Sequence, residues 1–261
     1  MSSGSTSVSK TAALTSFILL LFLSFTITAP LYSQTFGPRT AEANNYSLNW
    51  SGYAVVTSAG SVTSVSGSFI VPSVSCSRQT TYVALWAGID GFNSSTVEQA
   101  GVLAQCSSGK AYYSAWYEFY PSPSVTITSV AIKPGDAVSV VVSYNSGTFT
   151  VTLTDGSQTF SKSATVSNAA MSSAECILER PAIGGSITKL ANFGIANFGQ
   201  DYTHIQSTCY ATIAGNTSPF GSFGSMLQQI TMVNNRGKIL AAPSPISIDG
   251  SSFTITWYSS S

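Results

Sequence analysis

From residue 49 onward, the chain is dominated by short segments in which apolar residues alternate with small polar ones. The stretches 125–128, 137–142 and 148–154 are examples, and turn sequences such as Pro134-Gly135-Asp136 and Asn145-Ser146-Gly147 separate them. Alternation with a period of two residues, rich in β-branched side chains, is typical of strands that bury one face. Because no segment has the pattern of an amphipathic helix, we expect an all-β protein: an antiparallel sandwich of two sheets, or jelly roll.

The beginning of the chain differs in kind. Lys10 precedes the apolar run 11–29, which is typical of a secretory signal peptide and is almost long enough to span a bilayer. We therefore expect residues 1–34 to be a signal peptide or N-terminal anchor, 35–48 a linker or short leader remnant, and 49–261 one β domain. The expected location is extracellular, with membrane attachment only through an uncleaved N-terminal segment.

Charge narrows the possible partners. The chain has ten basic and ten acidic residues, and charged residues make up only 8 % of it. Nucleic-acid binding needs clustered Lys and Arg, so that class of protein is excluded. A surface built from Ser, Thr, Asn and Gln suits an acidic medium, in which carboxylates become protonated and a Lys-rich surface would repel itself. We expect a monomer.

The supply of reactive side chains excludes several chemistries. The four cysteines are an even number in an exported chain, which predicts two disulfides with three possible pairings. None has CxxC spacing and His204 is the only histidine, so we expect neither a zinc site nor a cofactor. Without a GxSxG motif a serine triad is not indicated, and His204 is predicted to be an ordinary loop or strand residue. Carboxylates and amides remain as the catalytic groups.

Four segments combine aromatic, acidic and amide side chains. They are Asn49-Trp50-Ser51-Gly52-Tyr53-Ala54; Trp86-Ala87-Gly88-Ile89-Asp90-Gly91 with Glu98-Gln99-Ala100-Gly101 after it; Tyr113-Ser114-Ala115-Trp116-Tyr117-Glu118-Phe119-Tyr120-Pro121; and Ala174-Glu175-Cys176-Ile177-Leu178-Glu179-Arg180-Pro181. In this order, over essentially residue 49 to the C-terminus, they resemble the glutamic peptidases, or eqolisins. The resemblance implies a concanavalin A-like lectin sandwich and a secreted acid endopeptidase that acts on polypeptides without a cofactor.

The resemblance also implies a catalytic pair of a glutamine and a glutamate. The glutamine maps to Gln99, and the glutamate to Glu179 or Glu175, of which we favour Glu179. Five further residues are expected to line or support the substrate site: Trp86, Asp90, Trp116, Glu118 and Tyr113. The family pattern Ala-Glu-Trp-Ile-x-Glu has Trp where this chain has Cys176, which puts the local packing in question.

Strand geometry constrains this pair. Glu175, Ile177 and Glu179 should point to one face of a strand, and Cys176 and Leu178 to the other. The two glutamates would then be about 13 Å apart along the strand, too far to share a proton. The partner must come from a neighbouring strand. There Glu98 and Gln99 face opposite sides, and the resemblance selects Gln99.

The expected chemistry is activation of water. A glutamate accepts a proton from the attacking water and returns it to the leaving amine, while the side-chain amide of Gln99 donates to the developing oxyanion. A neutral amide beside the base adds no repulsion between like charges. We therefore expect a base with a pKa near the ordinary ~4.3 and an acid pH optimum.

Two other classes of function fit part of the pattern. A glycoside hydrolase would use two carboxylates about 5–9.5 Å apart, for which Glu118 could pair with Glu175 or Glu179. A lectin-like binding module would use the same aromatic residues without catalysis. Taken one by one, Asp90 could be only a turn former, Glu118 a buried structural carboxylate and Gln99 an ordinary strand residue.

Overall fold

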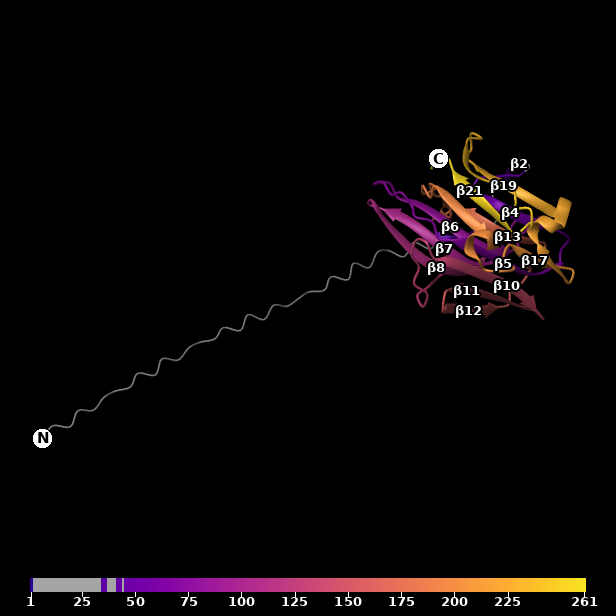
Figure 1. The fold of residues 1–261 in the computed structure, drawn as a ribbon, viewed down its shortest axis with the longest axis horizontal. Coiled ribbons are helices and arrows are strands. Elements are labelled where there is room, and N and C mark those ends of the chain that lie inside the picture. Colours follow the sequence, from indigo (N-terminus) through magenta and orange to yellow (C-terminus); the bar gives the residue numbers. More distant parts are fainter. Residues whose placement is uncertain (2–33, 37–40, 44) are drawn as a thin grey trace. The chain divides into compact units, whose positions relative to one another are not determined.

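The computed structural model describes residue 1 and residues 34–36, 41–43 and 45–261. The predicted signal peptide or anchor lies almost wholly outside the described residues. The account below concerns the compact unit formed by the described part of residues 32–261 (Figure 1). In that part of the chain, no helix is long and apolar enough to cross a membrane.

The first of two large sheets is antiparallel and carries all four segments singled out in the sequence. Its strands, in spatial order, are β9 (Val125–Ile127), β8 (Lys110–Tyr120), β7 (Val97–Ser107), β6 (Thr81–Ile89), β13 (Ser173–Glu179), β4 (Trp50–Val56) and β19 (Leu227–Val233).

The second sheet contains the alternating segments noted in the sequence and runs on through the C-terminal strands. Its members are β12 (Gln158–Ala164), β11 (Thr148–Asp155), β10 (Ala137–Asn145), β5 (Val62–Ile70), β17 (Tyr210–Ile213), β18 (Asn216–Pro219), β16 (Ile195–Gly199), β21 (Ser252–Trp257) and β20 (Ile239–Pro243). Strand β19 belongs to both sheets, because its first half pairs with β4 and its second half with β20.

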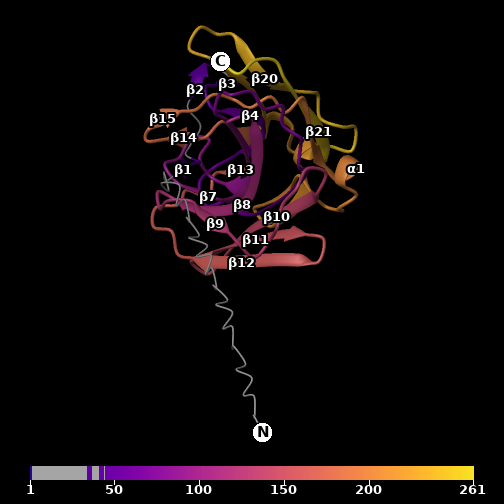
Figure 2. The ribbon, with the colours of Figure 1, turned by 90° about the vertical axis from the view of Figure 1, so that its left-hand side faces the viewer.

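The remaining elements are short. They are β2 (Ala41–Ala43) and β3 (Tyr46–Ser47) beside β19, the three-stranded group of β1 (Gln34–Thr35), β14 (Ala182–Ile183) and β15 (Ser186–Ile187), the helix α1 (Gln200–Thr203) and the 3₁₀ helix η1 (Phe220–Met226). Figure 2 shows β1, β14 and β15 side by side.

The two large sheets pack face to face around one hydrophobic core. Alternate residues of the second sheet, such as Val140 and Leu153, are fully buried against alternate residues of the first, such as Leu85 and Leu178. Side chains of a strand point alternately to its two sides, so each strand presents one apolar row to the opposite sheet. The predicted two-sheet antiparallel sandwich is confirmed.

The outer face of the first sheet carries a second apolar cluster. Trp50, Trp86, Trp116 and Ile177 belong to it, whereas Cys176 and its neighbour Leu178 lie in the core between the sheets. The two faces predicted for residues 175–179 are therefore confirmed. The second cluster also contains a residue from outside the strands of the first sheet, Phe36.

The cysteine prediction is only partly correct. Cys76 and Cys106 form a disulfide, but Cys176 and Cys209 are free thiols buried in the core, and the expectation of a second disulfide is wrong. The pKa of the Cys176 thiol is raised well above its usual value by burial and by a hydrogen bond with Cys209. The two thiols therefore lie next to each other without a covalent bond.

Packing explains why a cysteine replaces the Trp of the family pattern. Cys176 faces β5 at Gly67, and a Cβ atom built on Gly67 would lie 2.9 Å from the Cys176 sulfur and 2.6 Å from the Cβ of Ala87. At this point the opposite sheet approaches so closely that even a methyl group does not fit. A small side chain at 176 fills the remaining space.

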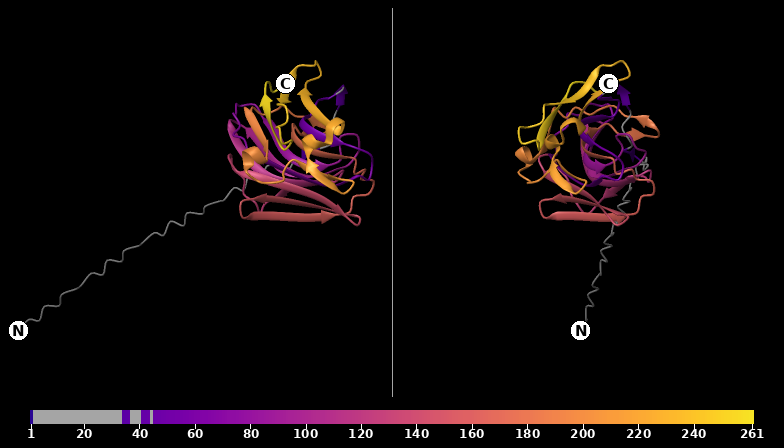
Figure 3. Two further views of the ribbon diagram at one scale, coloured as in Figure 1. Left: turned by 45° about the vertical axis from the view of Figure 1, so that its right-hand side comes forward. Right: turned by 90° about the vertical axis from the view of Figure 1, so that its right-hand side faces the viewer.

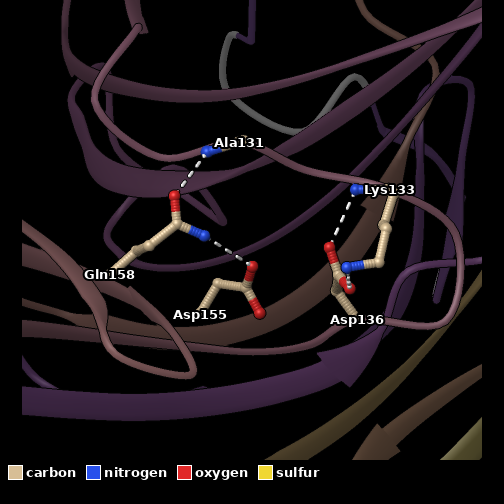
Figure 4. A network of polar contacts seen from close by, with 5 residues as sticks. All are labelled: Ala131, Lys133, Asp136, Asp155 and Gln158. Atoms are coloured by element: carbon tan, nitrogen blue, oxygen red, sulfur yellow. Dashed lines mark hydrogen bonds and ion pairs between the residues drawn. The ribbon is translucent and has the colours of Figure 1, made fainter.

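At the far edge of the second sheet, hydrogen bonds hold the turn before β10. Asp136 accepts a hydrogen bond from the backbone N–H of Lys133 (2.8 Å) and pairs with its ammonium group (3.2 Å). Gln158 of β12 accepts from the backbone N–H of Ala131 (3.0 Å) and donates to Asp155 (3.4 Å), as Figure 4 shows. In both views of Figure 3 the hairpin β11–β12 lies along the lower margin of the unit. These contacts fasten the edge of the second sheet.

Candidate active site

Gln99 and Glu118 occupy directly opposed positions on β7 and β8. Both side chains are fully buried, and the Nε2 amide of Gln99 donates to Oε2 of Glu118 at 3.0 Å. The pKa of Glu118 is raised to about 8, chiefly by burial, although the hydrogen bonds that it accepts from Phe36 and Gln99 act in the opposite direction. The structure therefore brings together two of the predicted site residues.

A peptide unit of the N-terminal segment lies on this pair. The Nε2 amide of Gln99 also donates to the backbone carbonyl oxygen of Phe36, and the backbone N–H of Phe36 donates to Oε2 of Glu118 at 3.3 Å. The ring of Phe36 stacks on Trp116 with 3.7 Å between ring centroids and 15° between planes. One residue of the chain thus contacts three predicted site residues.

Glu179 lies at the end of β13 on the same face. Its carboxylate accepts hydrogen bonds from Trp86 Nε1 at 3.0 Å and from Asn49 Nδ2 at 3.3 Å. The pKa of Glu179 is nevertheless raised well above its usual value, first by burial and then by the nearby carboxyl group of Glu118. We expected an ordinary pKa for the base. The pKa of Glu179 is raised instead, because its side chain is buried and has a second carboxyl group as a neighbour.

Gly88 on β6 keeps space open beside Gln99. A Cβ atom at this position would lie 2.9 Å from the Cβ of Gln99 and 3.1 Å from the ring of Trp86. Both side chains occupy the room that a side chain at 88 would need. The glycine in Trp-Ala-Gly-Ile-Asp-Gly is therefore a packing requirement of the site.

Glu175 belongs to a different group of carboxyls. Among the described residues, neither of its oxygens has a hydrogen-bond partner of good geometry, and the same is true of Glu98, although the Ser173 side chain is close enough to lower the pKa of Glu175 and Thr96 that of Glu98. Burial raises the pKa of Glu175 well above its usual value, and the nearby Asp90 and Glu98 raise it further. Burial, and then Asp90, also raise the pKa of Glu98, to about 9. Two protonated carboxyl groups at these positions avoid the cost of burying unpaired charges.

Asp90 ties two segments together. It is fully buried with a positive φ of 74°, and it accepts hydrogen bonds from the backbone N–H groups of Met171 (2.8 Å) and Ser172 (2.9 Å). The hydroxyl groups of Ser172 (3.2 Å) and Thr96 (3.4 Å) also donate to it. Asp90 thus fastens the start of the 90–96 loop to the residues before β13.

Two other residues do not join the group. The hydroxyl of Tyr113 donates to the Pro72 carbonyl (3.2 Å) and accepts from the Val74 N–H (3.1 Å), so it contacts the loop after β5 instead. His204 is exposed and ends helix α1 in a left-handed conformation, as the prediction of an ordinary loop residue implies. Among the described residues, no group of three or more His, Cys, Asp or Glu side chains could hold a metal ion.

The sequence analysis did not predict Asn49 and Phe36 as contacts of the site. It also did not predict that Glu98 lies close to Asp90 and Glu175. Asn49 opens the first of the four sequence segments, next to Trp50, and that position was the only signal available. Phe36 lies in the predicted leader, where no pattern indicated a contact. Glu98 and Gln99 are adjacent on β7, and the proximity of Glu98 to Glu175 follows from the sheet register, because Glu98 lies opposite Ile89 of β6 and Ile89 lies opposite Ala174 of β13.

Comparison with known proteins places the chain in a family. The model of the peptidase A4 family matches residues 48–244. Aspergillopepsin-2 from Aspergillus niger is 32 % identical over 238 residues, which is 81 % of this chain and 78 % of that protein.

Solved structures show the same fold. A scytalido-glutamic peptidase bound to a transition-state analogue inhibitor superimposes with a TM-score of 0.66 at 24 % identity, covering 80 % of this chain and 98 % of that one. The aspergilloglutamic peptidase of Aspergillus niger gives a TM-score of 0.57 at 25 % identity, with 68 % and 99 % covered. The chain belongs to the peptidase A4 family, the glutamic peptidases or eqolisins, and is a hydrolase that acts on peptide bonds.

Proposed function

We propose that this protein is an exported acid endopeptidase in which Gln99 stabilises the oxyanion and Glu179 is the general base. The observation that carries the proposal is the hydrogen bond from the Gln99 side-chain amide to the backbone carbonyl oxygen of Phe36. An amide that donates to a ground-state carbonyl is placed to donate to the oxyanion that forms from it. Export is supported by the apolar run 11–29 and by the disulfide Cys76–Cys106.

In the proposed reaction, Glu118 accepts the backbone N–H of the residue before the cleaved bond, as it does with Phe36. Water attacks the carbonyl carbon while Glu179 takes its proton, and Gln99 donates to the oxygen as its negative charge grows. Glu179 then passes the proton to the nitrogen of the leaving amine, and the C–N bond breaks. Trp86 and Asn49 orient the Glu179 carboxylate through the hydrogen bonds that they donate.

The two carboxyls of the site titrate as a pair. Ionisation of either Glu118 or Glu179 raises the pKa of the other, so the pair keeps one proton over a range of pH. The working form has Glu179 ionised and Glu118 neutral. Burial is the largest cause of both raised pKa values, and water entering the site lowers both. An acid working range therefore requires that water reaches both carboxyl groups when the enzyme is active.

Three substitutions test the assignment: Gln99→Ala, Glu179→Gln and Glu175→Gln, with cleavage of an unfolded protein followed from pH 2 to 7. We expect the first two to lose about 100-fold or more in kcat. Glu175→Gln should keep most of the activity, because its side chain lies with Asp90 and Glu98. A variant Glu175→Gln that is inactive although correctly folded, together with an active Glu179→Gln, would assign the base to Glu175. Activity in all three would contradict the mechanism.

A further inference from the structure

The N-terminal segment reaches the site as an added strand. Strand β1 pairs with β14 in antiparallel register, with Gln34 opposite Ile183 and Thr35 opposite Ala182. An extended peptide that pairs with an exposed strand is a common way of binding a polypeptide main chain, since backbone hydrogen bonds do not depend on sequence. Residues 34 and 35 therefore lead the chain into the site in an extended conformation, as a substrate would be held.

The next residue makes the two polar contacts that the proposed mechanism assigns to the residue before the cleaved bond. Phe36 presents its N–H to Glu118 and its carbonyl oxygen to Gln99, and its ring is stacked on Trp116. Only 1 % of Phe36 is exposed, so this residue fills a site and does not lie on a surface. The carbonyl that Gln99 contacts belongs to the peptide bond that links Phe36 to Gly37.

We propose that residues 34–36 are an internal substrate and that the enzyme cuts its own chain between Phe36 and Gly37. This inference rests on the proposed function. It names the first bond cleaved, and it makes the stacking surface of Trp116 the subsite for the residue before the cut. That subsite takes an aromatic side chain, because a flat ring can stack on the indole while its backbone reaches both Gln99 and Glu118.

The step balances without any further reagent. The oxygen of water forms a bond to the carbonyl carbon of Phe36, and the C–N bond to Gly37 breaks. One proton of the water goes through Glu179 to the Gly37 nitrogen, leaving a carboxyl group on Phe36 and an amine on Gly37. Until the cut is made and the segment leaves, the same contacts keep other polypeptides out of the site.

Incubation of the purified full-length chain at acid pH tests the proposal directly. Mass spectrometry and N-terminal sequencing should show a shortened chain that begins at Gly37, and Gln99→Ala and Glu179→Gln should stay uncut. Because the segment lies in its own site, the first-order rate constant should not change when the protein concentration is varied tenfold. A rate constant proportional to concentration, or a first cut elsewhere, would overturn the proposal.

A peptide added from outside avoids any effect of substitutions on folding. The ten-residue peptide with the sequence of residues 32–41 should be cut after its phenylalanine by the processed enzyme. The matched peptide with the Phe36→Ala change should have a kcat/KM lower by about tenfold or more. The change Phe36→Tyr should be tolerated, since it keeps the ring. Equal cleavage of the alanine peptide would overturn the aromatic subsite.

An unfolded protein substrate, tested in parallel, distinguishes a failure of the internal-substrate proposal from a failure of the peptidase proposal. If the enzyme degrades that substrate but leaves the bond after Phe36 intact in both chain and peptide, the internal-substrate proposal fails and the peptidase proposal stands. If folded wild-type protein cuts neither, the peptidase proposal fails as well.

Discussion

The side-chain amide of Gln99 lies 3.0 Å from the carboxyl group of Glu118 on the adjacent strand, and the same amide donates to the backbone carbonyl of Phe36. One amide nitrogen thus donates hydrogen bonds both to a carboxyl group and to the carbonyl oxygen of a peptide bond. Since both side chains are buried, their hydrogen bonds act in a medium of low dielectric constant, where an oriented donor stabilises developing charge more than it would in water.

The most direct test of the oxyanion role removes the side-chain amide of Gln99. We expect Gln99→Ala to lower kcat by about 10²–10³ with a much smaller effect on KM, because the hydrogen bond strengthens as charge forms on the carbonyl oxygen. Gln105→Ala on the same strand is the matched control, since its amide contacts only Tyr82 among the hydrogen bonds found for it (3.4 Å). A Gln99→Ala enzyme with altered KM and unchanged kcat would contradict the oxyanion role.

Replacing Glu118 with glutamine removes one member of the titrating pair. The variant Glu118→Gln is neutral at every pH, so the fall in kcat/KM that accompanies the second ionisation should move to higher pH or disappear. The acid limb, which reports Glu179, should change little. Initial rates are measured only where circular dichroism shows the folded state. An alkaline limb identical to that of wild type would show that Glu118 does not titrate in the working range.

The buried carboxyls predict how stability depends on pH. The folded-state pKa values of Glu98, about 9, and Glu118, about 8, lie above the ordinary 4.5, so the folded state holds these protons more tightly. This stabilisation is complete below pH 4.5 and is lost as the pH rises through 8 and 9. Each group contributes up to about 1.4 kcal/mol per pH unit. Urea unfolding should therefore show stability falling from pH 5 to pH 8.

A single substitution checks the cause of that fall. The variant Glu98→Gln should flatten the dependence of the unfolding free energy on pH between 5 and 9, whereas Asp201→Asn, at an exposed position, should leave it unchanged. Stability that rises over this range in the wild-type protein would show that these carboxyls are not protonated when buried.

The number of free thiols can be predicted from the structure. Alkylation of the denatured protein without reductant should label two residues, Cys176 and Cys209, and four after reduction. Replacing Cys76 and Cys106 together by alanine should lower the free energy of unfolding by about 3–4 kcal/mol, since the bridge closes a loop of 30 residues. No free thiol in the unreduced protein would show that the second pair is also bonded.

Restoring the tryptophan of the family pattern should destabilise this chain. The variant Cys176→Trp places a large ring against Gly67 and Ala87, where a single added Cβ already meets atoms at 2.9 Å and 2.6 Å. Overpacking of this kind costs at least about 1–3 kcal/mol. Cys176→Ala is the control, because it removes volume without a clash, and thermal unfolding of the two variants gives the comparison. A Cys176→Trp protein as stable as wild type would mean that β5 can move away.

Alternation along residues 173–179 was enough to determine which side chains share a face, because strand side chains alternate whatever their partners are. The same pattern determined the two-sheet sandwich, and the motifs around Gln99 and Glu179 indicated the family. Only the tertiary structure decided which carboxyls meet: Glu118 approaches Glu179, while Glu175 joins Glu98. Sheet register sets those distances, and it is not encoded in the period of a single strand. The position of Phe36 was equally invisible, because its partners lie far along the chain, at Gln99 and Glu118, and nothing local marks such a contact.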